Sequence, residues 1–103
     1  MTPTTSSAAL SLVAAERGPI RRLGVARLGI FGSLARNSAR ADSDLDVLVE
    51  FEAGQKTYDN LFELGALLEA RFGRRVELIT MDALSPYLGP KILREVQYAN
   101  LGN

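Results

Sequence analysis

The chain is 103 residues long, and its 47% hydrophobic and 23% charged residues are ordinary for a single folded domain of modest size. Twelve basic and twelve acidic residues give a formal net charge of zero, which argues against a protein built mainly to bind DNA or RNA. The sequence contains neither cysteine nor histidine, so disulfides, thiol catalysis, histidine bases and most transition-metal sites are excluded. Any catalysis must therefore use carboxylates, hydroxyls, lysine, arginine or a hard metal ion such as magnesium or manganese.

The N-terminal part predicts a flexible end followed by an interrupted helix. Residues 1–7 are rich in threonine and serine, so we expect a flexible N-terminus there and a single domain over residues 8–103. Apolar residues at helical spacing predict a helix over residues 8–23. Gly18 and Pro19 must break or restart this helix, because proline lacks the amide hydrogen that a helix interior needs.

Residues 8–15 could also be the apolar core of a short signal peptide. No basic residue precedes them and Arg17 follows them, which favours an amphipathic helix instead. No apolar run approaches the roughly 20 residues that are needed to cross a bilayer. We therefore expect a cytoplasmic protein that does not enter a membrane.

Two apolar segments predict β-strands. In the first, over residues 25–31, Ala26, Leu28 and Ile30 share one face. The second, over residues 44–51, is the clearest strand of the sequence, because its odd positions are all apolar and should pack under helices. Its even positions share the opposite face, away from that core: Asp44, Asp46, Leu48 and Glu50.

The remainder predicts a helix over residues 58–72, a strand over 75–80, and a turn followed by a helix over 82–98. In this strand Glu77 lies on the face opposite the apolar Val76. The order helix, strand, strand, helix, strand, helix indicates a small α/β or α+β domain. The helix over 58–72 should bury a stripe of Tyr58, Leu61, Gly65, Leu68 and Phe72, widened by Phe62 and Leu64.

The turn between the first two strands has the features of a phosphate site. Gly32 lets the backbone approach a ligand closely, and Gly32 and Ser33 open a short helical turn whose free amides can face an anion. The Ser33 hydroxyl is a further donor, and the guanidinium fork of Arg36 matches phosphate oxygens. Gly32, Ser33 and Arg36 are therefore the predicted phosphate-binding residues.

The strand after this turn carries a pair of carboxylates. Asp44 and Asp46 lie about 6.5 Å apart along a strand, so they can share one cation or bridge two ions about 3.5–4 Å apart. Glu77 would complete a three-carboxylate cluster if its strand pairs beside that of Asp46. We therefore predict Asp44, Asp46 and Glu77 as metal-binding and catalytic residues.

Each of these features also has an ordinary explanation. Gly-Ser is a common turn, two aspartates on a strand often mark a solvated face, and Arg36 can be plain surface charge. Glu77 on an amphipathic edge strand is more often solvated than catalytic. The functional interpretation depends on the conjunction of a strand, a Gly-Ser turn, a basic loop and an apolar strand with two aspartates on one face.

The segment IFGSLARNSARADSDLDVLVEF, with the pattern GS-x10-DLD, resembles the signature of the DNA-polymerase-β-like nucleotidyltransferases. The chain length and the elements that follow are similar to the minimal, MntA-like branch of this superfamily. The resemblance covers about residues 25–100. It implies an α+β fold with a small mixed β-sheet flanked by helices, as in the palm of polymerase β.

The resemblance also implies roles for the candidate residues and shows two departures from the family pattern. Asn37 stands where many relatives have glycine, and asparagine tolerates a left-handed backbone better than other residues with a side chain. The third carboxylate is commonly aspartate, and Glu77 is one methylene longer. Carried over by position, the triphosphate of ATP would be held by Gly32 and Ser33, and a two-ion magnesium site by Asp44, Asp46 and Glu77.

By the same resemblance, the chain is expected to transfer AMP from ATP to a hydroxyl of a protein partner. Members of this branch are commonly encoded beside HEPN-type RNase toxins, and members act as antitoxins that modify a tyrosine of the toxin. A short chain leaves little room for an acceptor-binding domain, which agrees with a partner held in a hetero-oligomer. The residues that could form a docking surface for this partner are Tyr87, Leu88, Ile92 and Tyr98. These apolar side chains could instead pack in the core of the domain.

Two other functions stay open at this point. The chain could neutralise its partner by occlusion, with a vestigial nucleotide site and no catalysis. It could also transfer a nucleotide to a small molecule or to an RNA 3′ end, although the zero net charge argues against direct nucleic-acid binding.

Overall fold

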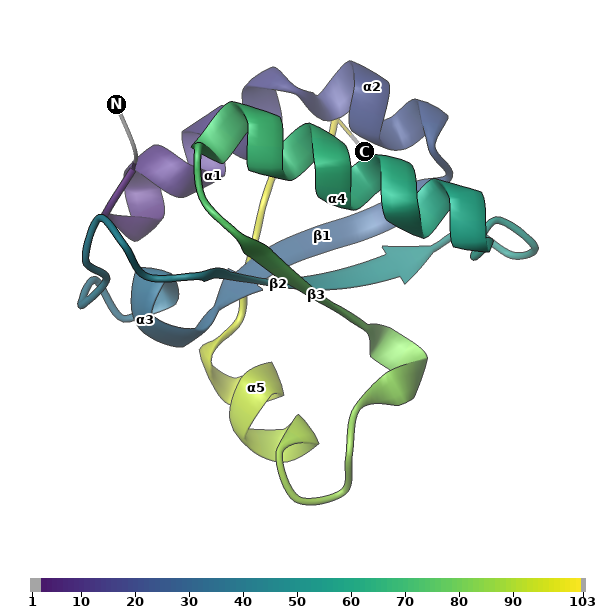
Figure 1. The fold of residues 1–103 in the computed structure, drawn as a ribbon. Helices are drawn as coiled ribbons and strands as arrows, with labels where there is room; N and C mark the ends of the chain where they lie inside the picture. Colours follow the sequence, from purple (N-terminus) through teal and green to yellow (C-terminus); the bar gives the residue numbers. More distant parts are fainter. Residues whose placement is uncertain (1–2, 103) are drawn as a thin grey trace.

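The computed structural model describes residues 3–102 and shows a four-stranded sheet with helices on both faces (Figure 1). Met1 and Thr2, part of the predicted flexible N-terminus, and Asn103 lie outside the described residues. Within residues 3–102, no helix is both long and apolar enough to span a bilayer. The elements are α1 (Ser6–Ala15), α2 (Arg17–Arg22), β1 (Val25–Phe31), α3 (Gly32–Ala35), β2 (Leu45–Phe51), α4 (Tyr58–Phe72), β3 (Val76–Thr80), a 3-10 turn η1 (Met81–Ala83), α5 (Gly89–Glu95) and β4 (Gln97–Tyr98).

The strands are arranged in the order β3-β2-β1-β4. β1 is antiparallel to β2 and to β4, whereas β2 and β3 are parallel. α4 supplies the crossover between the two parallel strands, because parallel neighbours cannot be joined by a tight turn. The predicted α+β domain with a small mixed sheet flanked by helices is confirmed.

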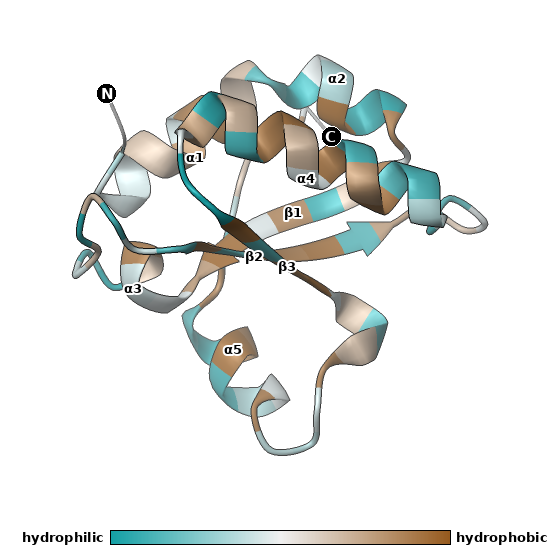
Figure 2. Ribbon diagram, in the orientation of Figure 1, coloured by the Kyte–Doolittle hydropathy of each residue, from teal (hydrophilic) through white to brown (hydrophobic). Residues whose placement is uncertain are grey.

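The two faces of the sheet are covered unequally. α1, α2 and α4 lie over one face, and α5 packs against the other (Figure 1). Hydrophobic residues are concentrated in the central strands between these layers (Figure 2). The face of β2 that carries the aspartates was expected to lie away from the core, but Leu48 packs there with Phe31 and Ile92 in a second, smaller core.

α1 begins two residues earlier than predicted. Its first residue is Ser6, and the Thr5 side chain caps it by accepting a hydrogen bond from the Ala8 amide at 3.2 Å. The Ser6 amide also donates to Oδ1 of Asn37 at 2.8 Å. This second bond ties the start of α1 to the loop that follows α3.

The break between α1 and α2 lies at Glu16 rather than at Gly18 and Pro19. Pro19 falls in the first turn of α2, where its missing amide hydrogen costs no helical hydrogen bond. In one continuous helix its ring would clash with the Ala15 carbonyl. The predicted interruption is confirmed, and its position is corrected.

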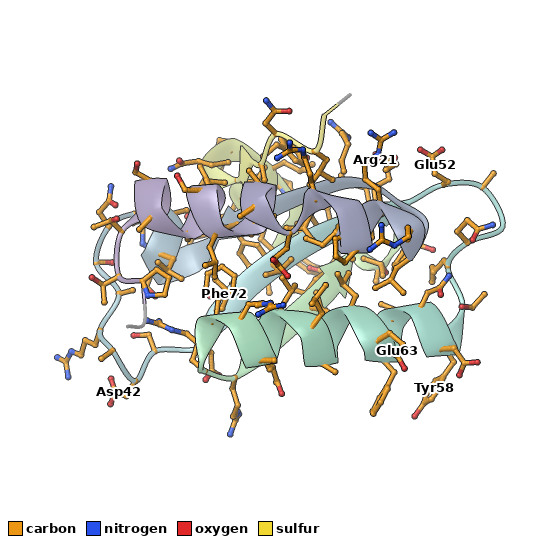
Figure 3. The ribbon with its side chains drawn as sticks, turned by 90° about the horizontal axis from the view of Figure 1, so that it is seen from above. Arg21, Asp42, Glu52, Tyr58, Glu63 and Phe72 are labelled. Atoms are coloured by element: carbon orange, nitrogen blue, oxygen red, sulfur yellow. The ribbon has the colours of Figure 1, made fainter. Side chains whose placement is uncertain are left out.

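α4 has the predicted bounds, but its buried face is shorter than predicted. Its buried residues are Leu64, Leu68 and Phe72, at helical spacing. Tyr58 and Phe62 are 82% and 65% exposed, so the predicted apolar stripe was wrong at its N-terminal end. Viewed from above, Phe72 lies between α4 and α1, whereas Tyr58 points away from the domain (Figure 3).

The C-terminal helix is shorter than expected, and a strand that the sequence did not predict follows it. α5 ends at Glu95, and Gln97–Tyr98 pair with β1 as β4. The pairing depends on Gly29, since a Cβ there would lie 2.6 Å from Cγ2 of Val96. A glycine in β1 therefore makes room for the returning chain.

Candidate active site

The predicted phosphate turn is a short helix at the end of β1. Gly32 and Ser33 begin α3, as the sequence indicated. The Ser38 amide donates to the Ser33 carbonyl at 2.8 Å, and Asn37 has a left-handed φ of 59°. The expectation that asparagine would keep the turn is therefore confirmed.

Gly32 packs directly against Asp46. β1 and β2 pair Phe31 opposite Asp46, which brings the next residue of the chain to the carboxylate. Gly32 has a φ of 72°, and a Cβ built on it would overlap Oδ2 of Asp46. Glycine is needed here both for the backbone conformation and for the close approach.

The three predicted carboxylates meet at this end of the sheet. Asp46 is in register with Glu77 across the parallel pair, and neighbouring strands lie about 4.8 Å apart. Asp44 directly precedes β2, with Arg75 Nη2 3.7 Å from its carboxylate. The predicted pairing of the Glu77 strand beside that of Asp46 is confirmed.

The crowding of these charges is visible at Asp46. The pKa of Asp46 is raised from 3.8 to about 6. Burial of the carboxylate contributes most to this rise, followed by the negative charges of Glu77 and Asp44. The cation of Arg36 opposes these effects. A hard cation would relieve the repulsion, so the donor set fits a magnesium or manganese ion.

A ready-made metal cage is not part of this conformation. Within the described chain, no group of three acidic side chains is already arranged to hold a metal ion. The assignment of Asp44, Asp46 and Glu77 as metal ligands stays a prediction, supported by their oxygen chemistry and by the repulsion of Asp46 by Glu77 and Asp44.

Glu95 is a site residue that sequence reasoning missed. Its Oε2 accepts a hydrogen bond from the Gly32 amide at 2.6 Å, and Arg36 Nη1 lies 3.0 and 3.2 Å from its two carboxylate oxygens. Burial alone would raise the pKa of Glu95, but the Gly32 amide and Arg36 together hold it below its usual value. No sequence signal announced this contact, because 63 residues separate Glu95 from Gly32.

Arg74 is a second residue that sequence reasoning missed. Its guanidinium is buried and donates to the carbonyls of Arg40 and Ser43, at 3.2 and 2.9 Å, and to the carbonyl of Pro3. These bonds fasten the loop that leads into Asp44. In the sequence, Arg74 directly follows Gly73, the glycine that ends α4. An arginine in such a position is too common to predict a role for it.

A hollow of about 350 Å³ lies at the other end of β2. Glu50, Phe51, Lys56 and Asp82 are among its lining residues, and Lys56 Nζ lies 2.7 Å from Oδ2 of Asp82. Within the described chain, none of the predicted site residues lines it. The candidate site is therefore recognised by its carboxylates and its glycine turn, and not by this cavity.

A family model for the nucleotidyltransferase domain matches residues 15–99 of the chain. The curated protein adenylyltransferase MntA of Thermococcus cleftensis is 39% identical to it over 89 residues. That match covers 85% of this chain and 89% of the Thermococcus protein. Residues 15–99, which the family model matches, contain every candidate site residue.

Solved structures resemble the fold. One that is assigned to the minimal nucleotidyltransferases has a TM-score of 0.70 at 39% identity, covering 85% of this chain and 93% of the other. A chain from the complex of a tri-AMPylated Shewanella oneidensis HEPN toxin with an MNT antitoxin has a TM-score of 0.54 at 18% identity, over 82% and 68% of the two chains, a likeness of fold alone. With its family match, its related sequences and its fold, the chain belongs to the nucleotidyltransferase domain family, in the minimal, MntA-like branch.

Proposed function

We propose that this nucleotidyltransferase moves AMP from ATP to a hydroxyl of a partner protein, and that it acts as the antitoxin of a HEPN-type RNase toxin. The observation that carries the proposal is the contact between the Gly32 turn and Asp46, whose carboxylate is crowded by Glu77 and Asp44. Phosphate donors directly beside carboxylates that suit a divalent cation are what nucleotidyl transfer requires.

The Gly32 turn binds the phosphates in the proposed reaction. The Gly32 amide, the Ser33 hydroxyl and the Arg36 guanidinium supply hydrogen bonds to the phosphate oxygens of ATP. These hydrogen-bond donors are already in position at the end of β1, so they stabilise the negative charge that develops on the leaving pyrophosphate.

The acidic end of the sheet serves the reacting atoms. Asp44, Asp46 and Glu77 are the residues that would hold two magnesium ions, whose charge would stabilise the attacking and departing oxygens. The acceptor oxygen bonds to the α-phosphorus of ATP while the bond to the bridging oxygen breaks and pyrophosphate leaves. Glu77, which is exposed, accepts the proton of the acceptor hydroxyl.

Two relatives support a protein as the acceptor. The similar Thermococcus protein is named a protein adenylyltransferase, and a HEPN toxin in complex with an MNT antitoxin is AMPylated. A formal net charge of zero also agrees better with a protein acceptor than with a nucleic acid. The proposed compartment is the cytoplasm, where ATP is available.

The HEPN-type partner is proposed to dock on the C-terminal apolar surface, defined as Tyr87, Leu88 and Tyr98. These side chains are 89%, 60% and 38% exposed. Ile92, the fourth candidate, is buried and belongs to the core. Core packing is therefore the explanation for Ile92.

The alternative is a non-catalytic antitoxin that occludes the toxin, and inhibition of the toxin's RNase activity separates the two. The protein is mixed with its HEPN-type partner and magnesium, with either ATP or α,β-methylene-ATP, in which the bond that must break is blocked. Transfer predicts that substoichiometric antitoxin inactivates the toxin with ATP only. Inhibition at equimolar ratio with either nucleotide, unchanged by Asp44→Asn, would instead establish occlusion.

A further inference from the structure

The Glu95 carboxylate occupies the donors of the Gly32 turn. Its contact with the Gly32 amide, at 2.6 Å, is a short hydrogen bond to a charged acceptor. In the same pair the Glu95 side chain is 19% exposed and that of Arg36 is 52% exposed, so the carboxylate lies on the inner side. The last residue of α5 therefore covers the first residue of α3.

The same two donors are assigned to phosphate in the proposed function. A carboxylate and a phosphate look alike to such a site, because each presents negatively charged oxygens to an amide and a guanidinium. One Gly32 amide hydrogen cannot make a short, well-aligned bond to both at once. Glu95 and a nucleotide must therefore exclude each other at Gly32 and compete for Arg36.

We propose that Glu95 is an internal competitor of ATP: its carboxylate fills the phosphate position of the nucleotide-free protein, and nucleotide binds by displacing it. The inference rests on the proposed function of the Gly32 turn. It assigns to α5 the control of nucleotide affinity, in addition to its part in the core.

The surroundings of Glu95 allow the side chain to leave without unfolding α5. Before it, Ile92 is buried against Phe31 and Leu48. After it, Gln97 Nε2 donates to the Ala35 carbonyl at 2.9 Å. These contacts hold α5 and β4 independently of the Glu95 carboxylate.

The negative charge of Glu95 also adds to the crowding at the acidic end. It is one of the charges that raise the pKa of Asp46. A side chain that only oriented Arg36 would not need this charge, since a neutral amide oxygen can also accept hydrogen bonds from Arg36 and Gly32. The full charge is what makes Glu95 a mimic of phosphate.

The test is the dissociation constant of two probes, Mg·ATP and inorganic tripolyphosphate with magnesium, measured by calorimetry on the full chain. Glu95→Gln keeps an acceptor oxygen for the Gly32 amide but removes the charge, and Glu95→Ala removes the acceptor as well. Both variants are expected to bind both probes about tenfold more tightly than the wild type. The matched control is Glu50→Gln, which removes an exposed carboxylate paired with Arg27 at 2.8 Å and should leave both constants unchanged.

The outcomes separate this inference from the proposed function. Tighter binding by the Glu95 variants, with or without detectable binding by the wild type, supports displacement. Unchanged or weaker binding by both variants, while the wild type binds ATP, overturns the inference and leaves the proposed function standing; weaker binding would make Glu95 a positioning residue for Arg36. If neither the wild type nor the folded variants bind ATP or tripolyphosphate, the inference and the proposed function both fail. Circular dichroism of each variant establishes that it is folded.

Discussion

Gly32 and Asp46 lie so close together that any side chain at position 32 would overlap Oδ2 of the aspartate. This relationship joins the turn that presents phosphate donors to the strand that presents carboxylates. It depends on two properties of one residue, a left-handed φ of 72° and the absence of a Cβ atom. The geometry of the candidate site is therefore sensitive to the smallest possible substitution at this position.

Gly32→Ala is expected to lower the free energy of unfolding by about 2–4 kcal/mol, from left-handed backbone strain together with the overlap with Asp46. Gly54→Ala is the matched control, because Gly54 has a φ of 78° and no atom within 4 Å of a Cβ built there. It should cost only the backbone part, about 1–2 kcal/mol. Urea unfolding measures the free energy of unfolding of both variants. Equal losses in the two variants would show that Asp46 does not fill the space beside Gly32.

The pKa of Asp46 predicts a pH dependence of stability. Because this pKa is raised from 3.8 to about 6, the folded protein holds the proton more tightly than the unfolded chain. The resulting stability is present in full below the ordinary value of 3.8 and is lost as the pH rises through about 6. Asp46→Asn cannot ionise and should escape this loss.

Unfolding of the wild type and Asp46→Asn, followed across this pH range in chelator, checks the prediction. The wild type should become less stable relative to Asp46→Asn as the pH rises. Above pH 6, magnesium should stabilise the wild type more than it stabilises Asp46→Asn. Parallel pH profiles for the two proteins would show that Asp46 is not crowded as described.

Arg74 should contribute to stability through its three carbonyl acceptors. Arg74→Met fills similar space but leaves the Arg40 and Ser43 carbonyls without their donor, so a loss of about 2 kcal/mol or more is expected. Arg75→Met, one residue later, changes a side chain that is 84% exposed and should cost less than about 0.5 kcal/mol. Chemical denaturation gives both values, and similar costs would remove Arg74 from its assigned role in holding the loop before Asp44.

The C-terminal apolar surface should matter for the partner and not for the fold. The double substitution of Tyr87→Ser and Leu88→Ser changes exposed side chains, so the melting temperature should stay near that of the wild type. Affinity for the HEPN-type partner should fall about tenfold or more, as read by surface plasmon resonance. Tyr58→Ser with Phe62→Ser, on the outer surface of α4, is the matched control, and a larger loss there would move the docking surface to α4.

The acidic end of the sheet could be predicted because strand parity is a local property. Side chains alternate with a period of two whatever the strand packs against, so the pattern predicted that Asp44 and Asp46 share one direction. The same parity turned Glu77 away from Val76, and the parallel register then brought Glu77 beside Asp46. The turn conformation at Asn37 followed from the backbone preference of one residue.

The missed features depend on contacts between distant parts of the chain. Glu95 bonds to Gly32 across 63 residues of sequence, and β4 forms only where Gly29 makes room for Val96. The length of the buried face of α4 was overestimated because Tyr58 and Phe62 fit an apolar stripe by spacing but remain exposed. Periodicity shows which residues share a helix face, but it does not show how far the neighbouring layer extends.

The carboxylates at the end of β2 are proposed to support the transfer of AMP to a protein. The most direct measurement is the intact mass of the HEPN-type partner after incubation with this protein, magnesium and ATP. The wild type should add one or more AMP masses to the partner, and Asp44→Asn or Asp46→Asn, folded but lacking a charged ligand, should add none. If the wild type neutralises the partner while the mass of the partner stays unchanged, the protein does not act by transferring AMP.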